Sequence, residues 1–104
     1  MEKGTAHFLC AAADVDPGTV RRVEIDGDGY AVYNIDGKFY VTDDRCTHGL
    51  ASLAEGELQG EVIECAMHFG GFHVPTGKPV LPPCSIPLRT FAVELRDGQV
   101  FVVI

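Results

Sequence analysis

Hydrophobic residues in this chain occur in short runs, with little of the 3.6-residue spacing that marks an amphipathic helix. The runs are rich in Val, Ile, Phe and Tyr, which suit a pleated and half-buried strand. We therefore expect strands over His7–Ala11, Val20–Ile25, Tyr30–Ile35, Lys38–Thr42, Glu61–Glu64, Phe72–Val74, Thr90–Arg96 and Gln99–Ile104.

Turn signals separate these runs. Asp36-Gly37 and Asp97-Gly98 are pairs that supply the positive φ of two-residue hairpin turns. Asp26-Gly27-Asp28-Gly29 and Asp16-Pro17-Gly18 are further turn signals. The pattern predicts an all-β fold, an antiparallel β sandwich or small barrel.

The middle of the chain, from about residue 43 to residue 83, has a different pattern. It is rich in glycine and proline and predicts mostly loop. So long a weakly structured segment is unusual in a small domain. We therefore expect a bound metal, rather than a hydrophobic core, to hold this segment together.

Composition and charge narrow the function. The 104 residues fit a single domain, and 46% hydrophobic residues suffice for a core. The net charge of -7 disfavours nucleic acid and anionic lipid as partners. No apolar stretch is long enough to span a membrane, and the first residues do not resemble a signal peptide. We therefore expect a cytoplasmic protein, whose four cysteines are more suited to metal binding than to disulfides.

Two short motifs in the middle segment contain ligand-type residues. They are Cys46-Thr47-His48 and Cys65-Ala66-Met67-His68, and 16 residues separate His48 from Cys65. Together they supply two thiolates and two imidazoles. Zinc would bind all four in a tetrahedron, although zinc pairs usually join two residues of the same type. One Cys and one His on each loop suits a [2Fe–2S] cluster with both Cys on one iron and both His on the other.

The two motifs, with their spacing, resemble the cluster-binding boxes of Rieske iron–sulfur proteins. The flanking sequences Lys38-Phe39-Tyr40-Val41-Thr42-Asp43 and Gly71-Phe72-His73-Val74-Pro75-Thr76-Gly77 are also similar to that family. The resemblance implies one Rieske [2Fe–2S] cluster ligated by Cys46, His48, Cys65 and His68. It implies a single domain over residues 1–104, in which a cluster-binding subdomain formed by two loops, about residues 43–83, is inserted in the β base.

The residues around the boxes resemble those of low-potential members of the family. Respiratory members have an extra Cys in each box, whereas this chain has Met67 in the second box and no such Cys after His48. Respiratory members also have Ser and Tyr at the positions of Gly70 and Phe72. A hydroxyl that donates to a cluster sulfur stabilises the reduced state and raises the potential. Losing two such donors predicts a potential of roughly -150 mV.

The resemblance extends to soluble ferredoxins of bacterial aromatic-ring-hydroxylating dioxygenases. It implies a one-electron carrier, not an enzyme, that takes electrons from an NAD(P)H-dependent flavoprotein reductase and delivers them to the terminal oxygenase. We expect it to act as a monomer in aromatic hydrocarbon catabolism. Two alternatives remain: the small Rieske component of a nitrite reductase or multicomponent monooxygenase, and a structural zinc module.

Residues near the boxes have less specific roles. An apolar collar around the histidines would either dock partners or shield the cluster, and its members are Leu50, Phe69, Pro75 and the segment Pro79–Pro83. Nearby acidic residues would either steer a basic partner or only solvate the surface, and these are Asp43, Asp44, Glu55, Glu57 and Glu64. We expect His73 on a surface strand, Cys10 and Cys84 as small buried side chains, and Gly70 and Gly71 at close backbone approaches.

Overall fold

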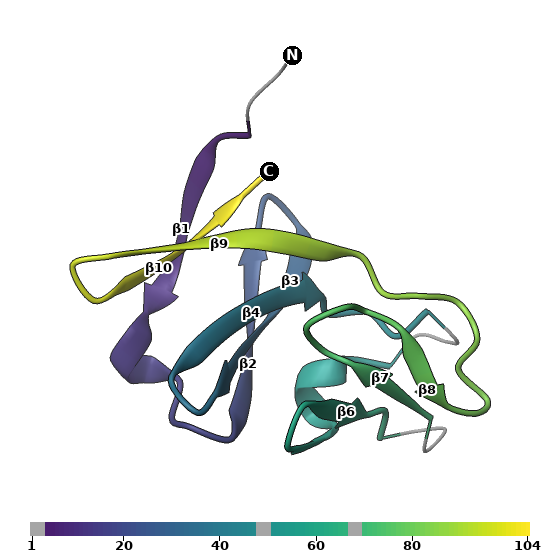
Figure 1. Cartoon of the computed structure of the whole chain (residues 1–104). Helices are drawn as coiled ribbons and strands as arrows, with labels where there is room; N and C mark the ends of the chain where they lie inside the picture. Colours follow the sequence, from purple (N-terminus) through teal and green to yellow (C-terminus); the bar gives the residue numbers. More distant parts are fainter. Residues whose placement is uncertain (1–3, 48–50, 67–69) are drawn as a thin grey trace.

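The computed structural model describes residues 4–47, 51–66 and 70–104, which form two antiparallel sheets (Figure 1). The large sheet has the order β1-β10-β9-β4-β3-β2, with β1 (Ala6–Ala11), β2 (Thr19–Ile25), β3 (Asp28–Ile35), β4 (Lys38–Asp43), β9 (Thr90–Arg96) and β10 (Gln99–Val103). The small sheet has the order β5-β6-β7-β8, with β5 (Glu57–Gln59), β6 (Val62–Glu64), β7 (Gly71–His73) and β8 (Pro79–Leu81). The 3-10 turns are η1 (Ala12–Asp14) and η2 (Leu53–Glu55).

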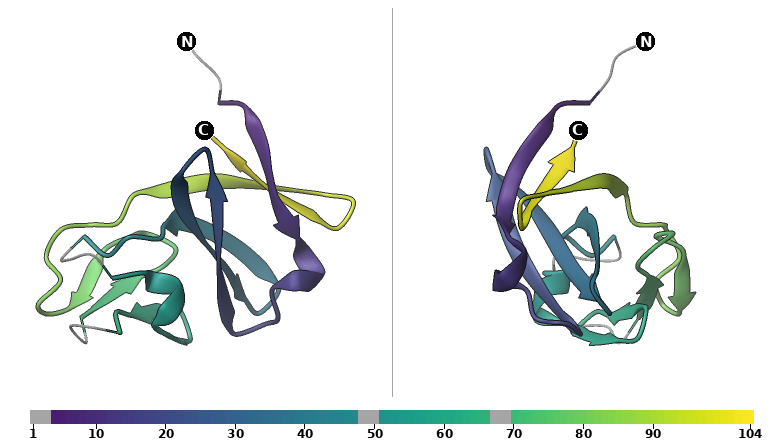
Figure 2. Two further views of the ribbon diagram at one scale, coloured as in Figure 1. Left: turned by 180° about the vertical axis from the view of Figure 1, so that it is seen from behind. Right: turned by 60° about the vertical axis from the view of Figure 1, so that its left-hand side comes forward.

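The large sheet curls on itself. Its two edge strands, β1 and β2, contact one another, so that the sheet approaches a half-barrel, as the rotated views in Figure 2 show. The small sheet lies beside one end of this half-barrel (Figure 1). This arrangement confirms the predicted all-β class. Neither helical turn within the described residues has the length or apolar character needed to cross a membrane.

Three hairpins of the large sheet turn on Asp-Gly pairs, as the sequence predicts. Asp36 and Gly37 have φ of 52° and 88°, and Asp97 and Gly98 have φ of 50° and 76°. Asp26 and Gly27 repeat the pattern between β2 and β3. Asp tolerates this left-handed conformation better than most residues and Gly adopts it freely, so these pairs fix the hairpin registers.

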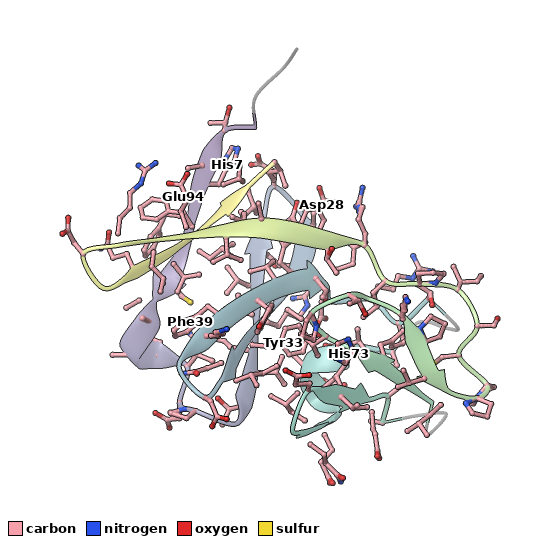
Figure 3. The ribbon with its side chains drawn as sticks, viewed as in Figure 1. His7, Asp28, Tyr33, Phe39, His73 and Glu94 are labelled. Atoms are coloured by element: carbon pink, nitrogen blue, oxygen red, sulfur yellow. The ribbon has the colours of Figure 1, made fainter. Side chains whose placement is uncertain are left out.

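Strand β3 is the shared wall between two cores, because both of its faces are buried. Tyr30 and Val32 face the interior of the half-barrel with residues of β1 and β10. Ala31 and Tyr33 face the opposite way, toward the small sheet (Figure 3). Tyr33 is fully buried, and burial raises the pKa of its phenol, which hydrogen-bonds Thr42 Oγ1 at 2.9 Å.

The structure corrects the expectation for residues 43–83. This segment contains the whole small sheet and packs against β3 in a hydrophobic core, in which Leu53, Ile63, Phe72 and Val74 are at most 1% exposed. The sequence pattern missed β5 and β8, because β5 has a single apolar residue, Leu58, between polar ones and β8 lies in a proline-rich stretch. The expectation that only a metal holds this segment is therefore wrong.

Candidate metal centre

Two of the four expected ligands lie among the described residues, and both are buried. Cys46 follows β4 and Cys65 follows β6, and each is 1% exposed. The other two, His48 and His68, lie outside the described residues, as does Met67. The two sheets thus bring both thiols of the predicted set into one hydrophobic core.

The two cysteines begin segments that close in the same way. The Cys46 N–H donates to the carbonyl of Ala51 at 2.9 Å, five residues later. The Cys65 N–H donates to the carbonyl of Gly70 at 2.7 Å, again five residues later. We call the closed segments, residues 46–51 and 65–70, the first and second loops. In sequence, each predicted histidine ligand lies inside one closed loop.

The base of the first loop is organised by Asp44, which is 3% exposed. Its carboxylate accepts hydrogen bonds from Arg22 Nε at 3.1 Å, Ser52 Oγ at 2.5 Å and the Ala54 N–H at 2.9 Å. Its carbonyl accepts the Leu53 N–H at 2.7 Å. Asp44 therefore ties β2 and η2 to the residues that precede Cys46, and the idea that it steers partners from the surface is wrong.

The base of the second loop is supported by packing. Gly70 is buried between the Leu81 carbonyl and Cys84, and a Cβ at position 70 would overlap Cys84 Sγ and lie 3.1 Å from the Cys84 nitrogen. The close approach expected at Gly70 is confirmed, but its neighbour is the Cys84 thiol. Phe72, two residues on, is fully buried in the same core as Cys46 and Cys65.

A third segment, residues 82–89, contacts both loops. Thr47 Oγ1 donates to the Ile86 carbonyl at 2.7 Å, and Arg89 forms an ion pair with Asp43 at 3.1 Å. Cys84 is 7% exposed, as expected for a small buried thiol. The pKa of Cys84 is raised to about 11, and burial is the main cause. The charge of Cys46, its hydrogen bond to Cys84 and the charge of Cys65 contribute in decreasing order. This third segment could not be recognised from the sequence, because prolines and isolated apolar residues give no periodic signal.

Other residues singled out in the sequence lie away from the thiols or on the surface. His73 is partly exposed on β7, where its ring contacts Glu61 Oε1 at 3.0 Å and Thr76 Oγ1 at 2.8 Å (Figure 3). This confirms a surface strand histidine. Cys10 is buried in the half-barrel core, as expected. Leu50 and Phe69 of the expected collar lie outside the described residues.

The donor chemistry fits one half of a mixed-ligand iron–sulfur site. Two buried cysteines begin two equivalent loops, and both belong to one buried core together with Cys84. The described residues include neither of the predicted ligands His48 and His68. Among them, no three His, Cys, Asp or Glu side chains are placed to hold a metal ion. The structure is that of a small β protein, in which a half-barrel, a small sheet and two paired loops bury two cysteine ligands.

Comparison with known proteins gives the family. Residues 5–92 match the model of the Rieske [2Fe-2S] domain. The chain is 53% identical over 95 residues to ferredoxin CarAc of Metapseudomonas resinovorans, covering 90% of this chain and 89% of that protein. It is 46% identical over 96 residues to the ferredoxin component of the p-cumate 2,3-dioxygenase system of Pseudomonas putida, covering 90% and 81%.

A solved structure gives the same result. One chain in the complex of reduced oxygenase and oxidized ferredoxin in carbazole 1,9a-dioxygenase superposes with a TM-score of 0.90 at 50% identity, covering 94% of this chain and 92% of that chain. The protein belongs to the Rieske [2Fe-2S] domain family. It therefore carries one Rieske-type [2Fe–2S] cluster and is an electron carrier of the ferredoxin type, not an enzyme in its own right. The zinc alternative is discarded.

Proposed function

We propose that Cys46, His48, Cys65 and His68 ligate the cluster, with one cysteine and one histidine from each loop. The support is the burial of both cysteines at equivalent positions of two loops closed by the same hydrogen bond. When bound, the cluster accepts and releases one electron at a time. The surrounding residues exclude water from the cysteine side, where Cys46 and Cys65 are buried. The 104 residues then act as a single domain, with the binding segment at about 43–83 inserted in the β base.

The ligand set is tested by removing one ligand at a time. The His68→Ala variant is expected to lose the mixed-ligand cluster, while His73→Ala, on the neighbouring strand, is expected to keep it at full occupancy. Iron and sulfide content with visible absorption measures both variants. A full Rieske spectrum in His68→Ala would overturn the ligand set.

We infer that the physiological role is to pass electrons from an NAD(P)H-dependent flavoprotein reductase to the terminal oxygenase of an aromatic-ring-hydroxylating dioxygenase. The observation that carries this inference is the 53% identity to a ferredoxin, together with the likeness to a ferredoxin in complex with an oxygenase. The net charge of -7 and the predicted low potential suit a small carrier that docks on basic patches of its partners.

Reconstitution tests this role. The protein is mixed with NADH and with the reductase and oxygenase of a carbazole or p-cumate dioxygenase system, and product formation is followed. We expect turnover that depends on this protein and falls with added salt, since screening weakens charge steering. No turnover with either system, despite a reducible cluster, would contradict the assignment to dioxygenases.

The surface beside the loops suits partner docking. Val80, Leu81 and Ile86 are exposed by 48%, 38% and 60%, and the main chain of Ile86 contacts Thr47 in the first loop. We propose that these side chains form the apolar centre of the docking surface, with the polar surface around them as its rim. Gathering exposed apolar side chains next to the buried ligands would shorten the path of the electron to a partner.

The docking surface is tested by matched variants. Ile86→Asp is expected to raise the ferredoxin concentration needed for half-maximal oxygenase turnover by about tenfold, as for a central interface residue. Leu95→Asp changes a side chain that is 53% exposed on β9, where Leu95 pairs with Val100 of β10 in the large sheet, and is expected to have no effect. Equal effects of the two substitutions would contradict the proposed surface.

We further propose that the protein is a cytoplasmic monomer that binds neither nucleic acid nor membranes. The supporting observations are the acidic composition and cysteines suited to a reducing compartment. Light scattering after size exclusion is expected to give the mass of one chain, and fractionation of the source cells is expected to place the protein in the cytoplasmic extract. A stable dimer would contradict the monomer, and recovery with the membranes would contradict the location.

A further inference from the structure

A third thiol lies against the two cysteines of the cluster site. Cys84 comes from residues 82–89, outside both loops, and belongs to the same buried core as Cys46, Cys65 and Phe72. Its sulfur occupies the space that a side chain at position 70 would need. Its main chain is fixed as well, because the Cys84 N–H donates to the Leu81 carbonyl at 3.3 Å.

The donor and the acceptor of the hydrogen bond between Cys84 and Cys46 can be assigned. The Cys84 and Cys46 side chains share a hydrogen bond within the buried core that holds both. A cysteine that ligates iron does so as a thiolate and has no proton to donate, so Cys84 donates the S–H and Cys46 Sγ accepts it. A ligating thiolate is a better acceptor than a thiol because it carries charge. Cys84 lies outside both Cys–His motifs, so we treat it as a neighbour of the ligands and not as a further ligand.

We propose that Cys84 is a positioning residue that donates its S–H to the ligand sulfur of Cys46 and so raises the reduction potential of the site. This proposal rests on the ligand set given under Proposed function. Reduction adds negative charge to the cluster and its ligands. A donor to a ligand sulfur therefore stabilises the reduced state more than the oxidised state.

The thiol and a side chain at position 70 exclude one another. Gly70 leaves the space that Cys84 Sγ fills, and any Cβ at position 70 would overlap that sulfur. The hydrogen-bond donor next to the cysteine ligands therefore comes from residues 82–89 and not from the second loop. Because S–H is a weaker donor than O–H, the thiol raises the potential less than a hydroxyl would.

The test compares three variants by redox titration followed by EPR. Cys84→Ala removes the donor and is expected to lower the equilibrium constant for reduction about threefold, a shift of about 30 mV to lower potential. Cys84→Ser keeps an O–H donor and is expected to hold the potential at or above that of the wild type. Cys10→Ala removes the other buried free thiol, in the separate half-barrel core, and is expected to leave the potential unchanged.

A fourth variant moves the donor. Gly70→Ser combined with Cys84→Ala places a hydroxyl in the space vacated by the thiol, and is expected to restore the potential lost in Cys84→Ala. Equal potentials for Cys84→Ala and the wild type would overturn the proposal. An equal decrease in Cys84→Ala and Cys84→Ser would also overturn it, because a packing defect and not a lost donor would then be the cause.

The wild-type protein provides a test that does not depend on how the variants fold. Infrared difference spectra between the oxidised and reduced protein are expected to show an S–H stretching band that moves to lower frequency on reduction, as the acceptor becomes more negative. The Cys10 band is expected to stay in place. An S–H spectrum that is identical in the two states would overturn the proposal. The EPR spectrum of the same sample tests the ligand set separately, so failure of either idea is recognised by itself.

Discussion

The two loops share one hydrogen-bond closure but differ in what holds them. The first loop is based on a buried carboxylate, Asp44, which collects hydrogen bonds from β2, Ser52 and η2. The second loop has apolar support, with Ile63 and Phe72 paired across β6 and β7 and Gly70 packed on Cys84. A charged network therefore fixes one cysteine, and close packing fixes the other.

This difference separates two ways of positioning a ligand. Hydrogen bonds to Asp44 are directional, so they set the path of the chain where it leaves β4 without needing a large core. Packing at Gly70 sets a distance of closest approach, which only glycine allows at this position. The first loop should therefore respond to loss of charge and hydrogen bonding, and the second loop should respond to added volume.

The largest effect is expected for Asp44→Ala. The substitution leaves Ser52 Oγ and the Ala54 N–H without their acceptor in a partly buried setting, which we expect to destabilise the protein by about 3 kcal/mol. Chemical denaturation of the cluster-loaded protein measures the change. Loss of bound iron is expected to accompany it, because the base of the first loop opens.

Asp43→Ala is the matched control, since Asp43 adjoins Asp44 in the chain but forms an ion pair with a largely exposed Arg89. Exposed pairs of this kind contribute at most about 1 kcal/mol. If Asp43→Ala destabilised the protein as much as Asp44→Ala, the central role of Asp44 in the first loop would be wrong.

Gly70→Ala tests the second loop and is expected to cost about 2 kcal/mol through overpacking against Cys84. Gly71→Ala is the control. Its Cβ would meet the end of the Leu81 side chain at 2.9 Å, and that flexible side chain can move aside. Thermal unfolding of both variants measures the difference. Similar melting temperatures would contradict the role assigned to Gly70.

The smallest effect is expected for Phe72→Tyr, which adds a hydroxyl in the core shared with Cys46 and Cys65. If the hydroxyl donates to a cluster sulfur, the potential is expected to rise by about 40 mV. Redox titration measures the shift, and iron content controls for occupancy. An unchanged potential with an intact cluster would show that position 72 does not face a cluster sulfur.

Much of the fold follows from local sequence. Alternating Val, Tyr and Phe predicts the long strands, and Asp36-Gly37 and Asp97-Gly98 fix their hairpins. The strands β5 and β8 were not predictable, because β5 has one apolar residue between polar ones and β8 lies among prolines, so that tertiary pairing alone selects them. The core under residues 43–83 was missed for a related reason. Its members, such as Leu53 and Phe72, come from separate short segments and meet only in the folded chain.

The candidate site was likewise predictable only where its sequence signal is local. The two Cys–His motifs could be found in the sequence because both ligands of each loop are close together. The roles of Asp44 and Cys84 could not, since each depends on partners from other parts of the chain. The sequence does not distinguish a buried aspartate from a solvated one. Nor does it distinguish a cysteine that only fills space from one that donates a hydrogen bond.

The central claim is mixed ligation of one cluster by Cys46, Cys65, His48 and His68. Low-temperature EPR of the dithionite-reduced protein, with nitrogen couplings resolved by ENDOR, tests it most directly. We predict a silent oxidised state and a rhombic reduced signal whose average g lies well below the free-electron value, with couplings to two imidazole nitrogens. A reduced signal without nitrogen couplings, or a colourless and EPR-silent protein, would contradict the account.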